Sequence, residues 1–179
     1  PNTAFASRPP VLPEDEALWD IQERGHQLLQ QYGYTQYEIS AYSQPGLQCR
    51  HNLNYWRYGD YLGIGCGAHG KVTLPEENRI IRTVKIKHPK GYLAASNYTF
   101  EQTEVAQEDR ALEYLMNRLR LMTPIPKQEF EDRTGLHRDT LKDGMEKAKQ
   151  RGLLTESAEH WQLTSKGHMF VNDLLTQFC

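Results

Sequence analysis

An amphipathic helix followed by two predicted strands constrains the fold of this chain more than any other feature. Apolar residues recur at helical spacing over residues 14–32, and Gly33 is suited to ending that helix. The segments 34–40 and 61–66 then have the pattern of strands, with a long loop between them. This order is typical of the last part of an α/β barrel, in which ligand-contacting residues lie in the loops after the strands. The loops that follow the two predicted strands are therefore the first places to search for a site.

The composition limits the classes of function that fit the chain. Its 179 residues are 38% hydrophobic, which is enough for one domain, or two small ones, with a real core. With 21 basic and 23 acidic residues the net charge is −2, which argues against a main role on nucleic acid or anionic membranes. No apolar run approaches the ~18 residues of a membrane-spanning helix. The three cysteines, Cys49, Cys66 and Cys179, fit neither a disulfide framework nor a cluster-binding spacing, so we expect a cytoplasmic protein.

The middle of the chain predicts a basic hairpin and then a long helix. Strands over 70–75 and 79–87 are joined by a turn at 76–78, and a helix is expected over 101–122. The basic residues of this segment are Arg79, Arg82, Lys85, Lys87, His88 and Lys90. This basic ribbon is either a solvated face of a sheet or a surface that contacts acidic groups, such as porphyrin propionates or a partner protein.

The last third of the chain has the pattern of a winged helix-turn-helix. Helices are expected over 127–134 and 137–151, joined at Gly135. Short strands over 153–155 and 161–164 would form the wing, and a last helix is expected over 165–177. The segment 137–151 has five Arg or Lys and three Asp or Glu residues, a smaller basic excess than DNA readers normally present. We therefore expect a structural or docking role here rather than binding to nucleic acid.

The sequence His-Asn-Leu-Asn-Tyr-Trp at residues 51–56 places an imidazole beside two aromatic side chains. Imidazole, a flat apolar surface and exposed backbone are what a protein needs to hold a planar metal cofactor such as heme. His51 is an axial heme ligand, a general base, or a histidine that only satisfies local hydrogen bonds. Tyr55 and Trp56 either flank a porphyrin or anchor the loop by packing. His69 is a second imidazole in the next loop, and Cys49 could supply a thiolate.

Residues 65–70, Gly-Cys-Gly-Ala-His-Gly, match the dinucleotide-binding pattern G-x-G-x-x-G in form. That mechanism requires a helix to begin at the glycines, so that its first turn meets the pyrophosphate. Here the chain continues Lys-Val-Thr-Leu-Pro, which does not begin a helix, and we reject the dinucleotide interpretation. What remains is a segment where the backbone can approach a bound nucleoside or amino-acid group, or a plain bulge.

Three segments together resemble a known family. They are residues 37–42, Cys49 with residues 51–56, and residues 59–70. They are similar to HemW heme chaperones, radical S-adenosylmethionine relatives of the oxygen-independent coproporphyrinogen III oxidase HemN, and the resemblance continues to the end of the chain. It implies that His51 binds heme iron and that Tyr55 and Trp56 pack against the macrocycle. It also implies that Gly65, Gly67, Ala68 and His69 correspond to a stretch near bound S-adenosylmethionine.

The chain departs from this family at one motif. Radical S-adenosylmethionine proteins hold a [4Fe–4S] cluster through CxxxCxxC, and this sequence has no such motif. We therefore expect a C-terminal fragment whose parent carries the cluster and S-adenosylmethionine. The implied fold is α/β (α+β), with the last part of a partial radical-SAM barrel in residues 1–90. A helical HemN-type domain would follow in residues 91–179, winged-helix-like from about residue 124. The open barrel edge should be covered, for example by a second copy.

Two functions from different classes follow from the resemblance. The first is a cytoplasmic heme chaperone that binds heme and passes it to an acceptor protein. The alternative is an enzyme, an oxygen-independent coproporphyrinogen III oxidase, because the barrel ancestry is shared; we do not expect the fragment alone to be active. The motif at residues 51–56 favours the chaperone. A regulator acting through the winged tail would instead need sequence-specific DNA binding that weakens steeply with salt.

Overall fold

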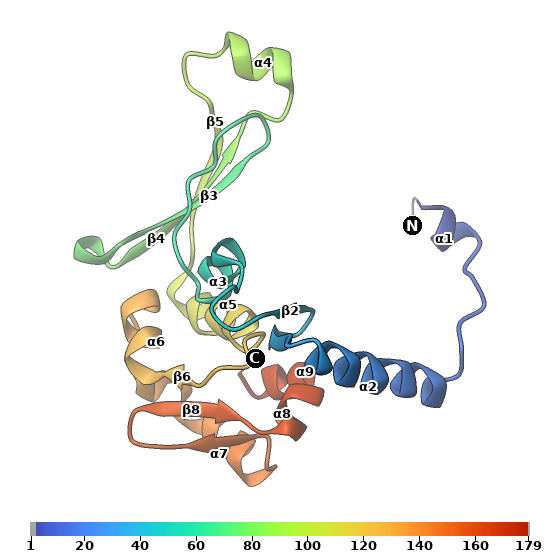
Figure 1. The fold of residues 1–179 in the computed structure, drawn as a ribbon. Helices are drawn as coiled ribbons and strands as arrows, with labels where there is room; N and C mark the ends of the chain where they lie inside the picture. The colour runs from blue at the N-terminus through green and yellow to red at the C-terminus, as the bar shows by residue number, and fades with distance from the viewer. Residues whose placement is uncertain (1–2, 179) are drawn as a thin grey trace. The chain divides into compact units, whose positions relative to one another are not determined.

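The computed structural model describes residues 3–178 and divides into two compact units (Figure 1). The first unit contains the residues up to Gln36 together with Ser40–Gln48, and the second contains Tyr37–Ile39 and the chain from Cys49 onward. The predicted domain boundary at residue 90 stays a prediction, although one sheet continues across it.

The main element of the first unit is helix α2 (Asp15–Gln31), which confirms the helix predicted over 14–32. Asp15 and Glu16 lie in its first turn, where carboxylates offset the positive end of the helix dipole. Gly33 follows the helix in the left-handed conformation, with φ of 77°. The other elements before residue 48 are α1 (Ala4–Ser7), β1 (Thr35–Glu38) and β2 (Ala41–Ser43); the two strands form a two-stranded sheet, and Tyr37 and Glu38 of β1 count with the second unit. Strand β1 confirms most of the strand predicted over 34–40.

The strand predicted over 61–66 is wrong. Within that segment only Tyr61 pairs, in an isolated antiparallel bridge with Lys71, and the chain then forms a loop up to His69. Gly63 explains the departure, because a β-carbon on it would lie 2.5 Å from the carbonyl oxygen of His69. Gly65, with φ of 105°, also leaves the range of a strand. The glycines let the chain fold closely onto itself here, instead of extending a sheet.

A three-stranded antiparallel sheet in the order β3-β4-β5 dominates the middle of the second unit. Its strands are β3 (His69–Leu74), β4 (Arg79–Lys85) and β5 (Thr99–Glu104). The predicted hairpin is confirmed, with the 3₁₀-helix η1 (Pro75–Glu77) at its turn. Helix α4 (Pro89–Ala94) links β4 to β5 and lies at the far tip of the sheet (Figure 1).

The helix predicted over 101–122 is wrong in its first part, because the chain through Glu104 is strand β5. Helix α5 runs over Gln107–Arg118 only. The polar residues 101–104 have no strong period of their own, and they are extended because their backbone pairs with β4. Pairing between segments has overridden local propensity here.

Helix α3 (Arg50–Trp56) lies in the second unit and leads to buried Tyr58. Edge-to-face contacts join Tyr58 to Tyr114 at 6.1 Å, Tyr114 to Phe130 at 5.3 Å, and Phe130 to Trp161 at 6.3 Å between ring centroids. These rings belong to one hydrophobic core that also includes Leu115, Leu119, Ile125, Leu141, Met145 and Leu153. The region after α3 and the winged tail therefore share a core.

The winged helix-turn-helix pattern is confirmed in the last third of the chain. Its elements are β6 (Ile125–Pro126), α6 (Lys127–Thr134), η2 (Arg138–Leu141), α7 (Lys142–Gln150), β7 (Leu154–Glu156) and β8 (His160–Leu163). The strands form a sheet in the order β6-β8-β7. The predicted last helix is divided at Phe170 into α8 (Ser165–Met169), α9 (Val171–Leu175) and η3 (Thr176–Phe178). Among residues 3–178, no helix is long and apolar enough to cross a membrane.

Candidate functional site

Helix α3 directs the side chains of the 51–56 motif to three different sides. The helix has seven residues, and each residue turns the direction of the side chain by about 100°, so residues four apart share a side. The three pairs are His51 with Tyr55, Asn52 with Trp56, and Arg50 with Asn54. The motif is therefore not one surface, and each side has to be considered separately.

The first side carries a series of three rings. The ring centroids of His51 and Tyr55 lie 4.7 Å apart, and those of Tyr55 and Tyr61 lie 4.5 Å apart. His51 is exposed, and neither of its ring nitrogens has a hydrogen-bond partner among residues 3–178. The structure thus combines an available imidazole with two adjoining phenol rings. Tyr61 was missed as a site residue, because its contact with Tyr55 depends on the loop that the sequence had predicted as a strand.

The second side fixes the helix to the rest of its unit. Asn52 donates a hydrogen bond to the Tyr37 hydroxyl at 3.2 Å. The guanidinium of Arg120 lies 4.3 Å above the Trp56 ring, and the same arginine pairs with Glu38 at 3.0 Å. The buried Nε1 of Trp56 has no hydrogen-bond partner in the described part of the chain. Trp56 therefore contacts Arg120 and not the ring series, and its predicted packing against a macrocycle stays a prediction.

The end of α3 is held by a buried lysine. Tyr58 has a left-handed backbone, with φ of 55°, and its hydroxyl donates to Glu113 at 2.7 Å. The ammonium of Lys71, only 2% exposed, lies 4.1 Å from the Tyr58 ring centroid. It donates to the Tyr58 carbonyl and to Asp60 Oδ1, each at 3.0 Å. These contacts place α3 and Tyr61 firmly at one end of the β3–β5 sheet.

The electrostatics of this anchor follow from burial and pairing. Burial raises the pKa of Tyr58, and the hydrogen bond to Glu113 adds to that effect. Burial also lowers the pKa of Lys71, although Asp60 opposes the shift. At Asp60 burial acts to raise the pKa, but hydrogen bonds from Thr73 and Lys71 outweigh it and hold the pKa below its usual range. Lys71 and Asp60 therefore form a charged pair that serves structure.

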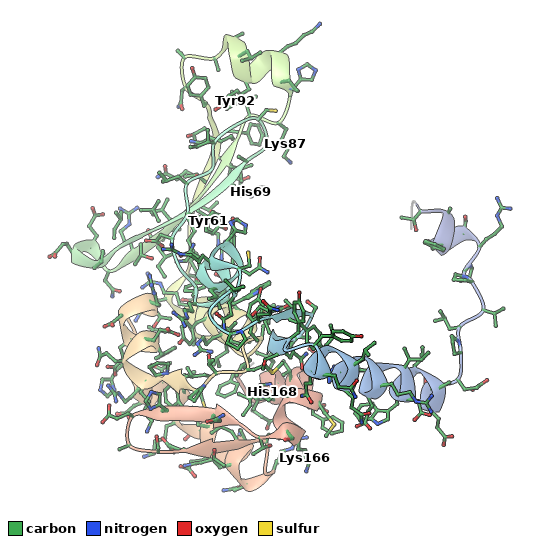
Figure 2. The ribbon with its side chains drawn as sticks, in the orientation of Figure 1. Tyr61, His69, Lys87, Tyr92, Lys166 and His168 are labelled. Carbon is green, nitrogen blue, oxygen red and sulfur yellow. The ribbon has the colours of Figure 1, made fainter. Side chains whose placement is uncertain are left out.

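The residues predicted to lie near S-adenosylmethionine form the loop before β3. The Gly65 amide donates to the Tyr92 hydroxyl at 3.2 Å, and the Gly67 amide donates to the Ile86 carbonyl at 2.9 Å. The Ala68 carbonyl accepts from the Lys85 amide at 2.8 Å. Figure 2 shows Tyr61 at the end of the sheet towards α3 and Tyr92 at the end that carries α4. The loop therefore runs along the sheet between these two ends.

His69 begins β3 opposite Val84. Within residues 3–178, no group of three or more His, Cys, Asp or Glu side chains is arranged to hold a metal ion. A metal at His51 would therefore take a single ligand from the described residues. That donor set fits heme iron, because the porphyrin itself supplies the equatorial nitrogens, and it does not fit a bare transition-metal ion. Cys49 and Cys66 are free and exposed.

Comparisons with known proteins show which families the chain resembles. The family model "HemN C-terminal domain" matches residues 105–170, from the end of β5 through the winged region. The heme chaperone HemW of Haemophilus influenzae is 56% identical over 99% of the chain, and that of Escherichia coli is 54% identical over 99%. The chain is HemW-like. It spans 46% of the Haemophilus protein and 47% of the Escherichia protein.

More distant matches extend the comparison. The HemW of Bacillus subtilis is 30% identical over 93% of the HemW-like chain and 44% of its own length. The structure of coproporphyrinogen III oxidase (HemN) from Escherichia coli, described as a radical SAM enzyme, superposes with a TM-score of 0.63. It is 15% identical and covers 93% of this chain and 42% of that one. This likeness shows that the chain has the fold of the corresponding part of HemN.

Proposed function

We propose that the HemW-like chain supplies the heme-binding region of a heme chaperone. The observation that carries the proposal is the exposed imidazole of His51 at the head of the Tyr55–Tyr61 ring series. The relatives named heme chaperone HemW, at 54% and 56% identity, support the same function. A single available imidazole beside flat aromatic surface is the minimum that axial heme binding requires.

Each residue of the proposed heme site has a separate role. His51 would donate a nitrogen lone pair to the iron, while Tyr55 and Tyr61 would present ring surface to one side of the macrocycle. Trp56 and Asn52 hold the helix from its other side, so the imidazole keeps its place when heme leaves. Exposure of His51 suits a chaperone, because an acceptor protein must reach the cargo in order to take it over.

Several finer statements belong to the same proposal. The full-length protein would carry a [4Fe–4S] cluster and S-adenosylmethionine, with the latter near the loop of Gly65, Gly67, Ala68 and His69. Gly65 supports this, because a β-carbon there would meet no atom within 4 Å, so a ligand could approach its backbone. We further propose a cytoplasmic location and a heme-acceptor protein as partner. Self-association at the barrel edge stays a prediction.

The test is a hemin titration followed by absorbance, on the chain and on its His51→Ala variant. The expected result is a saturable Soret shift at roughly micromolar hemin that the variant loses. His69→Ala is the matched control, because it removes an exposed histidine at the start of β3 and should leave the shift intact. Equal binding by the wild type and His51→Ala would contradict the assignment of His51.

The HemN-like fold favours one second candidate, an oxygen-independent coproporphyrinogen III oxidase. The two functions separate in an assay of the full-length protein with coproporphyrinogen III under anaerobic conditions. The chaperone proposal expects no robust formation of protoporphyrinogen. Robust formation would show that the protein is an enzyme and would remove the view that it acts as a chaperone alone.

A further inference from the structure

A basic pocket lies against the third side of α3. It has a volume of about 240 Å³ and is lined by Arg50, Leu53, Asn54, Arg57 and Arg133. Arg50, Leu53 and Asn54 come from α3, Arg57 caps the end of that helix, and Arg133 comes from the last turn of α6. Helical spacing brings Arg50 and Arg57 to one side of α3, and tertiary folding adds Arg133, which is distant in the sequence.

These three guanidinium groups have no ion pair with any carboxylate among residues 3–178. The carboxylates of α6 are already engaged elsewhere. Glu129 accepts from Arg118 at 2.7 Å, Glu131 pairs with Arg138 at 2.7 Å, and Asp132 accepts from Gln128 at 2.9 Å. The pocket is thus a concentration of positive charge that the described residues do not neutralise, and such a pocket attracts an anion.

The chemistry of the pocket indicates which anion it suits. Guanidinium groups match carboxylates in geometry and form two parallel hydrogen bonds with them. Leu53 adds an apolar wall, which suits a short hydrocarbon stem behind the charged group. At about 240 Å³ the pocket is below the usual range of sites that enclose a whole small molecule, so it would take one edge of a larger ligand.

We propose that Arg50, Arg57 and Arg133 bind the propionate carboxylates of the heme whose iron His51 ligates. This inference rests on the proposed function and adds to it the groups that recognise the anionic edge of the cargo. Arg50 directly precedes His51, so one helix would carry both the iron ligand and part of the carboxylate site. The propionates are the anionic groups at the edge of the macrocycle, and the pocket offers their complement.

The basic ribbon is less suited to this role, because its inner cations are occupied. Arg79 pairs with Glu77 at 2.7 Å and with Glu104 at 2.8 Å, and Arg82 pairs with Glu113 at 2.6 Å. A ligand carboxylate would have to displace these partners. We therefore assign the propionate contact to the arginines beside α3 and not to Arg79 or Arg82 of the ribbon.

The experiment compares hemin with hemin dimethyl ester, in which both propionates are esterified. The triple variant Arg50→Gln, Arg57→Gln, Arg133→Gln should bind hemin at least roughly tenfold more weakly than the wild type, with the Soret position of the bound state unchanged. The two proteins should bind the dimethyl ester equally. The matched control is Lys87→Gln, Lys90→Gln, Arg151→Gln, which removes three exposed positive charges elsewhere and should keep the affinity of the wild type.

Iron-free protoporphyrin IX separates failure of this inference from failure of the proposed function. It keeps the propionates but offers no iron to His51, and its binding is followed by porphyrin fluorescence. If His51→Ala does not change hemin binding while the arginine variant weakens both hemin and protoporphyrin, the iron ligand is wrong and the carboxylate site holds. Equal weakening in the arginine variant and the matched control, or no weakening in either, would overturn the inference. No binding of either porphyrin by the wild type would overturn both proposals.

Discussion

The β3–β5 sheet and the pocket beside α3 both carry basic side chains, but their surroundings differ. In the sheet, buried Lys71 pairs with the partly exposed Asp60 at 3.0 Å, and Arg82 contacts Glu113 at 2.6 Å. Beside α3, Arg50 and Arg57 face a pocket without a carboxylate partner among the described residues. The number of basic residues in a segment therefore gives its formal charge, but it does not show which of these cations are free to bind a ligand. Where the fold pairs the cations they serve stability, and where it leaves them unpaired they can serve a ligand.

The largest expected effect is at Lys71. Lys71→Met keeps the approximate length of the side chain but leaves Asp60 and the Tyr58 carbonyl without their donor. Lys71 is buried but Asp60 is 38% exposed and can turn to water, so the main cost is the Tyr58 carbonyl left without a donor. The free energy of unfolding should therefore fall by about 1–3 kcal/mol. Urea denaturation followed by circular dichroism measures this change. A change below about 0.5 kcal/mol would show that the pairing in the sheet is not what stabilises it.

The same pair predicts a smaller, pH-dependent effect. In the folded state the pKa of Asp60 is held below its ordinary value of 3.8, so its contribution to stability is present above that value and is lost as pH falls through the folded pKa. The hydrogen bond and the charge of Lys71 are part of what lowers the pKa of Asp60, and Lys71→Met removes both. The stability difference between the wild type and Lys71→Met should therefore be largest near neutral pH and shrink as the solution is made more acidic than the usual Asp range. A difference that grows on acidification would contradict the coupling.

The third effect concerns a half-exposed pair of the sheet. A double-mutant cycle with Arg82→Gln and Glu113→Gln should give a coupling energy of about 0.5–1 kcal/mol, because water competes with this contact. Raising the salt concentration should reduce the coupling. A coupling energy near zero would mean that Glu113 does not hold Arg82. Arg82 would then be available to a ligand, and the basic ribbon would again be a candidate surface for binding propionates.

The smallest expected effect is at Arg57. Arg57→Gln removes no ion pair from the described residues, so the free energy of unfolding should stay within about 0.5 kcal/mol of the wild type. The measurement is the same urea titration. A loss comparable to that of Lys71→Met would mean that Arg57 is structural and would remove the contrast between the two regions.

The parts of the fold that the sequence predicts are those in which a local pattern decides. The helix over 14–32, the hairpin and the winged tail have periodic apolar residues or clear turn signals, and the structure contains them. Strand β5 was not predicted, since its polar residues are extended only by pairing with β4. The false strand over 61–66 was predicted from its apolar residues, whereas close approach of Gly63 to His69 sets its actual path.

The candidate site shows the same limit. His51 and Tyr55 are four residues apart in a short segment, so helical spacing alone is enough to bring them together. Tyr61 and Arg133 reach α3 only through the loop before β3 and the packing of α6, and no local pattern shows that. Trp56 illustrates the reverse case, because it is adjacent to Tyr55 in the motif and yet lies against Arg120.

Helix α3 is too short to form alone. Its seven residues are well below the ~12–15 at which isolated helices become even marginally stable in water. Its end is held by distant groups, because Tyr58 is left-handed and Lys71 donates to its carbonyl. A synthetic peptide of residues 49–60 would therefore be a coil in which the imidazole and the phenol rings move independently. The hexapeptide motif grafted onto another protein would therefore not keep this arrangement of rings, because it would lack the β3–β5 sheet that fixes the end of the helix.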